Sequence, residues 1–189
     1  MNKTVFYFLL LMLSGLSLPC GAVQAPDPEL RALLSKAVNE SDSFQDRFHA
    51  EVWLTDMSQR LAGIIKDPEQ RLFLLKNIHY EATRAKLPPE LVLAVIQVES
   101  YFDRWAISVS GAQGLMQVMP FWLKEIGHPD DNLFDIRTNL RMGCTILRYY
   151  MDKSKGDLTR ALARYNGSGH SRRYPDKVYK LLGSRWFKQ

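Results

Sequence analysis

A single carboxylate ends a strongly apolar stretch of the chain. Residues 91–98 read LVLAVIQV, and Glu99 follows them directly. Pro88 and Pro89 precede the stretch and suit the first turn of a helix, where the backbone needs no N–H donor. A helix that is apolar on every side is normally buried, and burial raises the pKa of a carboxyl group because its charged form loses hydration. A carboxyl group that stays protonated near neutral pH can act as a general acid, so Glu99 is our first candidate catalytic residue.

A loop rich in glycine and small polar residues follows this helix. Residues 108–119 read SVSGAQGLMQVM, and Gly111 and Gly114 permit tight backbone turns. We expect this loop to fold back beside the end of the helix, close to Glu99.

Three short motifs occur in one order along the chain. They are Glu99-Ser100 with Ser108 nine residues after the glutamate, Gly114-Leu115-Met116-Gln117 ahead of Pro120, and Tyr165-Asn166-Gly167. Together they resemble the catalytic domain of the soluble lytic transglycosylases, in the lysozyme-like superfamily. The resemblance covers roughly residues 72–182. It implies an all-α, lysozyme-like enzyme that cleaves the glycan strands of peptidoglycan without a cofactor.

The resemblance also implies a mechanism and two catalytic residues. Glu99 would protonate the oxygen of the β-1,4 bond between N-acetylmuramic acid (MurNAc) and N-acetylglucosamine (GlcNAc). It would then accept the proton of the MurNAc C6 hydroxyl, whose attack on the anomeric carbon closes a 1,6-anhydro ring. Because this nucleophile is internal, no water has to be positioned, whereas typical glycosidases use a second carboxylate. Tyr165 would orient the catalytic acid.

Four further residues match positions that bind substrate in the family. Ser108 would hydrogen-bond the acid or the substrate, and Gln117 offers both a donor and an acceptor to sugar amides and hydroxyls. Met116 would give soft apolar contact to a sugar face, and Asn166 accompanies the tyrosine. Without the family resemblance, Ser108 would be interpreted as a turn serine, Gln117 as a surface glutamine and Met116 as a core methionine.

Two positions depart from the family's pattern. Asp103-Arg104 stands where an Asn-Pro pair is common, and Arg164 stands where a small residue commonly precedes the Tyr-Asn pair. Asp103 is the acid nearest to Glu99 in the sequence, but a turn residue is the better interpretation of it. Trp105 and Trp122 flank the loop at residues 108–119, and either could stack on a sugar.

The first residues of the chain predict export. Met1-Asn2-Lys3 gives a positive start, residues 5–18 are almost wholly apolar, and small residues follow at Gly21, Ala22 and Ala25. The apolar run is too short for a membrane span and fits a secretory signal peptide. We predict a signal peptide over residues 1–22, with cleavage as late as residue 25 as the alternative. The chain would then be secreted across the inner membrane into the periplasm, with no stable membrane insertion after signal removal.

Charge is unevenly distributed along the chain. Residues 137–189 hold 13 Lys or Arg and 3 Asp, out of 25 basic and 20 acidic residues in all. A basic half favours an anionic partner, for which an acidic cell-wall polymer and nucleic acid are both candidates. The export signal and the lack of a recognised nucleic-acid motif argue against nucleic acid. Two other functions stay open: a hydrolase similar to goose-type lysozyme, and a non-catalytic peptidoglycan-binding protein.

Apolar residues recur at helical spacing along the rest of the chain, and no segment alternates cleanly over several residues. We therefore predict an all-α fold, with a lysozyme-like domain and a helical extension before it. Asp67-Pro68 should cap and begin one helix, and either Asp135 or Thr138 should cap another. We assign the extension to residues 26–70 and the catalytic domain to residues 71–186. The expected helices cover about residues 26–38, 44–65, 68–85, 89–99, 121–126, 135–151, 157–166 and 174–186.

The chain offers no recognisable cofactor site. His49, His79, His128 and His170 lack metal-ligand spacing with one another or with Cys144, and no phosphate-binding glycine loop is present. We therefore predict neither a metal nor an organic cofactor. Cys144 lies in a helical pattern and is expected to be a buried structural thiol.

Overall fold

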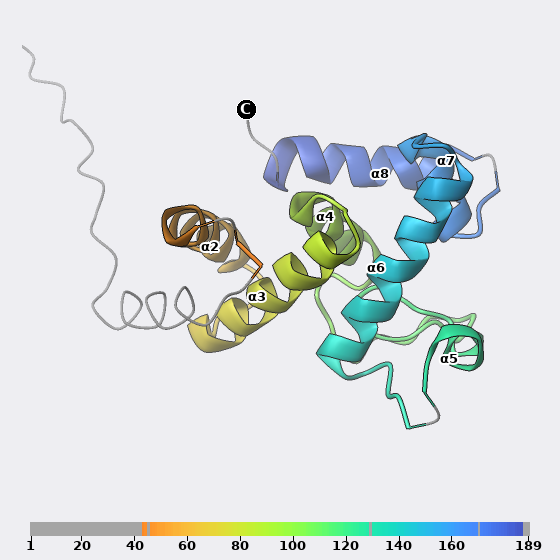
Figure 1. Cartoon of the computed structure of the whole chain (residues 1–189), viewed down its shortest axis with the longest axis horizontal. Coiled ribbons are helices and arrows are strands. Elements are labelled where there is room, and N and C mark those ends of the chain that lie inside the picture. Colours follow the sequence, from red (N-terminus) through yellow and green to blue (C-terminus); the bar gives the residue numbers. More distant parts are fainter. Residues whose placement is uncertain (1–42, 45, 129, 170, 187–189) are drawn as a thin grey trace, which may run out of the picture.

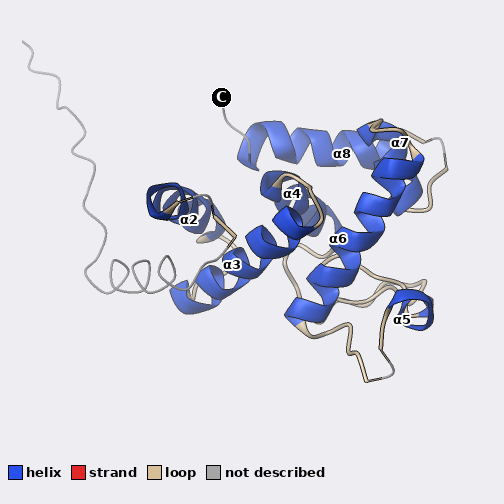
Figure 2. Cartoon of the chain, in the orientation of Figure 1, coloured by secondary structure: helices blue, strands red, loops and turns tan. Residues whose placement is uncertain are grey.

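The computed structural model describes residues 43–44, 46–128, 130–169 and 171–186. The signal peptide and the helix that we predicted over residues 26–38 lie outside these described residues. The helices are α2 (Arg47–Leu61), α3 (Pro68–Arg84), α4 (Pro89–Glu99), α5 (Phe121–Ile126), α6 (Ile136–Lys153), α7 (Leu158–Tyr165), α8 (Arg173–Leu181) and the π-helical turn η1 (Leu182–Trp186). The described residues contain no β-strand, only isolated bridges within the loop at 107–118. The predicted all-α class is therefore confirmed (Figure 2).

Aspartates at the helix starts account for several of the predicted boundaries. The side chains of Asp67, Asp135 and Asp157 accept backbone N–H groups from the first turns of α3, α6 and α7. An oxygen at this position satisfies an N–H group that has no partner inside the helix. The predicted cap of α3 is confirmed, and Asp135 is the residue that caps α6. The helix expected from residue 44 begins only at residue 47, because Asp46 caps α2.

Helix α4 lies at the centre of the helical part of the molecule. Residues 91–96 are at most 2% exposed, and α3, α8 and η1 pack against them (Figure 1). The continuous apolar sequence thus forms a helix that is buried on all sides, as its pattern predicted. Its C-terminal residue, Glu99, takes its position from this packing.

Helix α2 packs against α3 and belongs to the same hydrophobic core. Trp53, Leu54 and Met57 are buried there, and the Trp53 indole N–H donates to Glu90 Oε1 at 2.7 Å. A division of the chain between residues 70 and 71 would fall inside the first turn of α3. Helix α2 is therefore packed together with the helices that we assigned to the catalytic domain.

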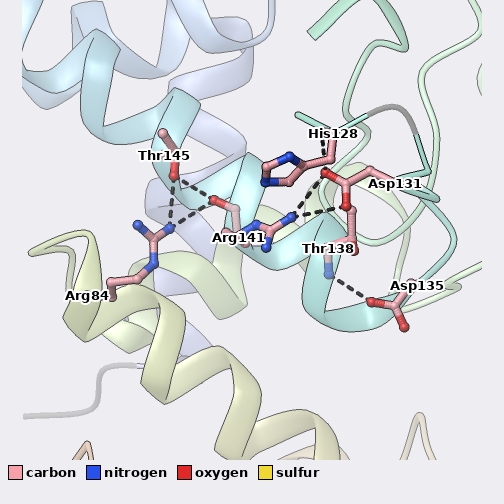
Figure 3. Close-up of polar contacts among 7 residues, drawn as sticks. All are labelled: Arg84, His128, Asp131, Asp135, Thr138, Arg141 and Thr145. Atoms are coloured by element: carbon pink, nitrogen blue, oxygen red, sulfur yellow. Dashed lines mark hydrogen bonds and ion pairs between the residues drawn. The ribbon is translucent and has the colours of Figure 1, made fainter. Parts of the chain in front are cut away.

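Loops around the short helix α5 lie beside the helices and occupy most of residues 100–135 (Figures 1 and 2). On α6, Arg141 Nη2 contacts both carboxylate oxygens of Asp131 in these loops, at 3.1 and 3.2 Å (Figure 3). On α3, Arg84 donates to the carbonyl of Arg141 at 3.1 Å and to the hydroxyl of Thr145 at 2.9 Å. Helix α6 therefore connects the loops to α3.

The variant Leu54→Ala tests whether α2 contributes to the core. Leu54 is 0% exposed, so its truncation should leave a cavity and lower the free energy of unfolding by roughly 2–5 kcal/mol. Val52 lies on the same helix but is 53% exposed, so Val52→Ala should change that free energy by less than about 0.5 kcal/mol. Urea denaturation of both variants and of the unsubstituted chain measures the two effects. Equal midpoints for the two variants would show that α2 is not part of the core.

Candidate active site

Glu99 is the last residue of α4, at the point where this buried helix reaches the loops. Its side chain is partly buried, and this burial raises the pKa of its carboxyl group to about 7. The hydroxyl of Tyr174 and the ammonium group of Lys177, both on α8, act in the opposite direction and limit the rise. A large share of the carboxyl is therefore protonated at neutral pH, as a proton donor requires.

Tyr174 approaches the Glu99 carboxyl from α8. It is 6% exposed, and its hydroxyl oxygen has no fully formed hydrogen bond to any described residue. The hydroxyl lies beside the Glu99 carboxyl and, as a donor, lowers its pKa. Burial, and then the charge of Glu99, raise the pKa of Tyr174 well above its usual value. The hydroxyl therefore keeps its proton and can donate it in a hydrogen bond.

Tyr165, at the end of α7, contacts a different atom from the one that we expected. Its hydroxyl donates to the backbone carbonyl of Met116 at 2.7 Å, not to the carboxyl of Glu99. Burial, and then the charge of Glu99, raise the pKa of Tyr165, so the two side chains are close enough to interact electrostatically. Tyr165 is thus placed to hold the motif loop next to the acid.

The side chain of Asn139 on α6 anchors this motif loop, which we define as residues 113–118. Its Nδ2 donates to the carbonyls of Gln113 at 2.9 Å and Leu133 at 2.7 Å. Its Oδ1 accepts the backbone N–H of Met116 at 2.8 Å. Asn139 is only 1% exposed, so these bonds satisfy polar groups that water does not reach.

Ser100 joins the end of α4 to the same loop. Its hydroxyl donates to the carbonyl of Leu115 at 2.8 Å. The motif loop is thus held from α4, α6 and α7 through Ser100, Asn139 and Tyr165. Because all three helices pack into the core, the loop has a defined position relative to Glu99.

The structure gives Met116 a different role from the predicted one. Its side chain is 0% exposed, packs against Gly143 and lies 3.9 Å from the Cys144 sulfur. A sugar cannot reach this thioether, so the expected apolar contact to a sugar face does not fit the structure. The main-chain N–H and C=O of Met116 are instead the groups through which Asn139 and Tyr165 hold the loop.

Gln117 is partly buried and uses one end of its amide within the loop. Its Nε2 donates to the carbonyls of Ala106 at 3.1 Å and Gly114 at 3.0 Å. Because both partners are acceptors, the nitrogen must point toward them. The amide oxygen therefore points away from these carbonyls and offers an acceptor.

Ser108 and Asn166 have local contacts in this structure. The Ser108 hydroxyl accepts the backbone N–H of Ala112 at 3.0 Å and lies 3.0 Å from the Ser110 hydroxyl. It makes no bond to Glu99, so the expected contact with the acid is not seen. Asn166 ends α7 and is exposed.

Our sequence analysis missed two residues that shape this site. Tyr174 appeared only as the start of the last helix, and Asn139 was not singled out. A signal for Asn139 was present, because it is a polar residue in a helix where Leu140, Gly143 and Cys144 are buried. Nothing in the sequence pairs Tyr174 with Glu99, because they are 75 residues apart in different helices.

The surroundings of Cys144 agree with the expected structural thiol. It is free and fully buried, and burial raises the pKa of its thiol. Among the described residues, no group of His, Cys, Asp and Glu is placed to hold a metal ion. No helix in the part of the chain that the structure describes is both long and apolar enough to cross a membrane.

A family model described as "Transglycosylase SLT domain" matches residues 76–187, which is more than half of the chain. The chain belongs to this transglycosylase family. The SLT match begins inside α3 and includes Glu99, the motif loop, Asn139, Tyr165 and Tyr174. Helix α2 precedes it.

The SLT region is similar to parts of longer proteins. Over 114 residues the chain is 37% identical to a transglycosylase of Enterobacteria phage PRD1, covering 57% of this chain and 42% of the phage protein. Over 107 residues it is 39% identical to the membrane-bound lytic murein transglycosylase F of Desulfosudis oleivorans. This match covers 51% of this chain and 23% of the Desulfosudis protein. Compared as structures, the chain and the solved 70 kDa soluble lytic transglycosylase of Escherichia coli have a TM-score of 0.44 and 23% sequence identity. This match covers 82% of this chain and 24% of the Escherichia coli protein. The chain thus spans less than half of the length of each of these proteins.

The variant Gly114→Ala tests how tightly the motif loop lies against α6. Gly114 has a φ of +73°, and a Cβ atom there would lie 2.5 Å from the Leu133 carbonyl and closer still to the Asn139 amide. Gly111 is a matched control, because it has a φ of +86° and open space around the position of a Cβ. Gly111→Ala should cost only the roughly 1–2 kcal/mol of a left-handed backbone conformation, and Gly114→Ala should cost more. Equal losses of thermal stability in the two variants would contradict this geometry.

The raised pKa of Glu99 predicts a pH-dependent stability. A carboxyl group with a pKa of about 7 in the folded state, against an ordinary 4.5, binds its proton more tightly when the chain is folded. The free energy of unfolding should therefore fall as pH rises from about 4.5 to about 7, and this group should have no further effect above that interval. Glu99→Gln removes this dependence, so its stability relative to the unsubstituted chain should increase over the same interval.

Urea denaturation at pH 4.5, 6 and 8 measures this difference, with Glu125→Gln on α5 as an exposed control. A Glu99→Gln difference that is the same at all three pH values would show that Glu99 titrates like an exposed carboxyl group.

Proposed function

We propose that the protein is a peptidoglycan lytic transglycosylase. It cleaves the β-1,4 bond between MurNAc and GlcNAc without water and leaves 1,6-anhydro-MurNAc ends. One observation carries this proposal: the carboxyl of Glu99, at the end of the buried helix α4, has a pKa raised to about 7 beside the motif loop. The family of the chain and the names of its relatives support the same activity.

The reaction uses Glu99 twice. The protonated carboxyl donates its proton to the glycosidic oxygen as the bond from that oxygen to the MurNAc anomeric carbon breaks. The resulting carboxylate accepts the proton of the MurNAc C6 hydroxyl, and the hydroxyl oxygen forms the new bond to the anomeric carbon. Glu99 ends the cycle protonated, and no water is consumed. A pKa near the working pH suits a group that must both give and take a proton.

The surroundings of Glu99 favour an internal nucleophile. Tyr174 and Lys177 are the side chains that act on its pKa, and neither is a carboxylate. Asp103 is exposed, and its Oδ1 accepts the backbone N–H of Trp105 at 2.9 Å, which is the turn role that we expected for it. A glycosidase that hydrolyses its substrate typically needs a second carboxyl group as nucleophile or base.

The remaining predicted residues have roles around this step. The Tyr165 hydroxyl holds the motif loop, and the Tyr174 hydroxyl donates to Glu99 whenever Glu99 carries its negative charge. The amide oxygen of Gln117 accepts from sugar hydroxyl or amide groups, and Ser108 and Asn166 contact the glycan on either side. Met116 contributes its main-chain position rather than its side chain.

Two alternatives differ in a measurable product. A hydrolase similar to goose-type lysozyme would use the same acid but release free reducing ends. A non-catalytic peptidoglycan-binding protein would release nothing. The protonated Glu99 beside an organised loop argues against the second alternative, because a binding surface has no need of a buried acid.

Location and partners follow from the same activity. We propose that residues 1–22 direct export to the periplasm and that no stable membrane insertion remains after their removal. Peptidoglycan glycan strands are the partner, nucleic acid is not, and no cofactor takes part. The relatives named membrane-bound lytic murein transglycosylases support an extracytoplasmic site of action. We further propose that the helical extension before the SLT region packs with the catalytic domain as one unit.

Digestion of purified sacculi with the unsubstituted chain, Glu99→Gln and the exposed control Glu125→Gln tests the proposal. Glu99→Gln loses both proton transfers, and one such transfer contributes about 10²–10⁴-fold, so it should be nearly inactive. The unsubstituted chain and Glu125→Gln should release muropeptides one water lighter than hydrolysis products, as measured by mass spectrometry. Substantial activity in Glu99→Gln would remove the mechanism, and free reducing ends would make the protein a hydrolase.

A further inference from the structure

We propose that a cavity between α3 and the loop that follows α4 is a second saccharide-binding site, built around Trp105 and Phe73. This inference rests on the proposed function in one respect: the ligand is a stretch of the glycan strand that the enzyme would cleave. The site would bind the GlcNAc units of that strand, which are uncharged, at a distance from the scissile bond.

The cavity has the size and lining of a small-ligand site. Its volume is about 660 Å³, and neither Glu99 nor Tyr165 lines it. Phe102, Leu74 and Leu115 supply buried apolar surface, and Trp105 and Phe73 supply aromatic rings that are 61% and 44% exposed. Ligand pockets usually combine such apolar and aromatic surface with a few polar groups that set orientation.

Trp105 is exposed but held in place. The Arg104 guanidinium lies 4.5 Å from the centre of its ring and donates to the Phe134 carbonyl at 2.9 and 3.2 Å. The Trp105 backbone N–H is bonded to Asp103 Oδ1, and its ring lies 5.7 Å from that of Phe134. An exposed aromatic ring that is already ordered loses little conformational entropy on binding, which favours recognition. Trp122, the other tryptophan that we considered, is partly buried.

The polar groups of the cavity suit sugar hydroxyls. Glu69 and Gln70, in the first turn of α3, and Asp103 line it with carboxylate and amide oxygens that accept hydrogen bonds. The single cationic lining residue, Arg104, is already bonded to Phe134 and stacked on Trp105. A second guanidinium, that of Arg137, lies 5.7 Å from the centre of the Phe73 ring. The exposed carboxylates of Glu69 and Asp103 accept hydrogen bonds from sugar hydroxyl and amide groups.

Two residues that line the cavity lie close in sequence to the candidate active site. Phe102 and Leu115 line it, and they are close neighbours in sequence of Glu99 and Met116. The Ser100 hydroxyl joins the two segments through the Leu115 carbonyl. A glycan strand that occupies both sides would therefore span one short stretch of loop. Asp103 and Arg104 are also the positions where this chain departs from the family's usual Asn-Pro pair.

The test measures glycan binding apart from turnover. All variants are made in the full chain with Glu99→Gln present, and calorimetry follows binding of N-acetylglucosamine hexamer. Trp105→Ala and Phe73→Ala should each weaken binding about tenfold, the size expected for truncating one well-packed contact residue. Trp105→Phe should retain most of the affinity. Tyr80→Ala, on α3 with 52% exposure and outside the cavity, is the control and should leave the affinity unchanged.

A kinetic measurement separates this site from the catalytic one. With Glu99 intact, Trp105→Ala should raise KM on long strands about tenfold and leave kcat on a tetrasaccharide unchanged. Unchanged hexamer affinity in both Trp105→Ala and Phe73→Ala would overturn the proposal, whether or not the protein is a transglycosylase. Loss of binding to isolated peptide stems alone would also overturn it, because the occupant would then be peptide. If glycan affinity depends on Trp105 while the Glu99 enzyme releases no muropeptides, the proposed reaction fails and the saccharide site stands.

Discussion

The three hydrogen bonds of the Asn139 amide hold together the parts of the candidate active site. They join α6 to Gln113, Met116 and Leu133 in a place that water does not reach. A buried backbone group that loses its partner costs about 1–3 kcal/mol, so few other side chains fit this position. Gly114 is required for the same reason, because a Cβ atom would displace the amide. The loop that faces Glu99 thus takes its shape from a residue that cannot itself touch substrate.

Opposed effects set the pKa of Glu99, and burial is the larger of them. Burial at the end of α4 favours the protonated carboxyl, and Tyr174 and Lys177 on α8 favour the carboxylate. An acid that only donates a proton would need the first effect alone. A group that must also accept a proton needs its charged form stabilised within the same cycle. The packing of α8 against α4 is what supplies both conditions.

The loops after α4 separate two surfaces of different character. On one side Glu99 meets α7 and α8, with the hydroxyls of Tyr165 and Tyr174. On the other side Phe102 and Leu115 face α3 and line the cavity beside Trp105. Because Ser100 ties the end of α4 to Leu115, both surfaces are positioned by the same few residues.

The sequence by itself determined the features that depend on neighbouring residues. Asp67 and Asp157 cap helices because a side-chain oxygen reaches the first-turn N–H groups of its own helix. The apolar run at 91–98, interrupted only by Gln97, was enough to predict a buried helix that ends at Glu99, and three spaced motifs were enough to indicate the family. Tertiary structure alone decided which atoms these side chains contact. Tyr165 bonds Met116, 49 residues away, because of how α7 packs, and neither periodicity nor capping contains information about which distant segments meet.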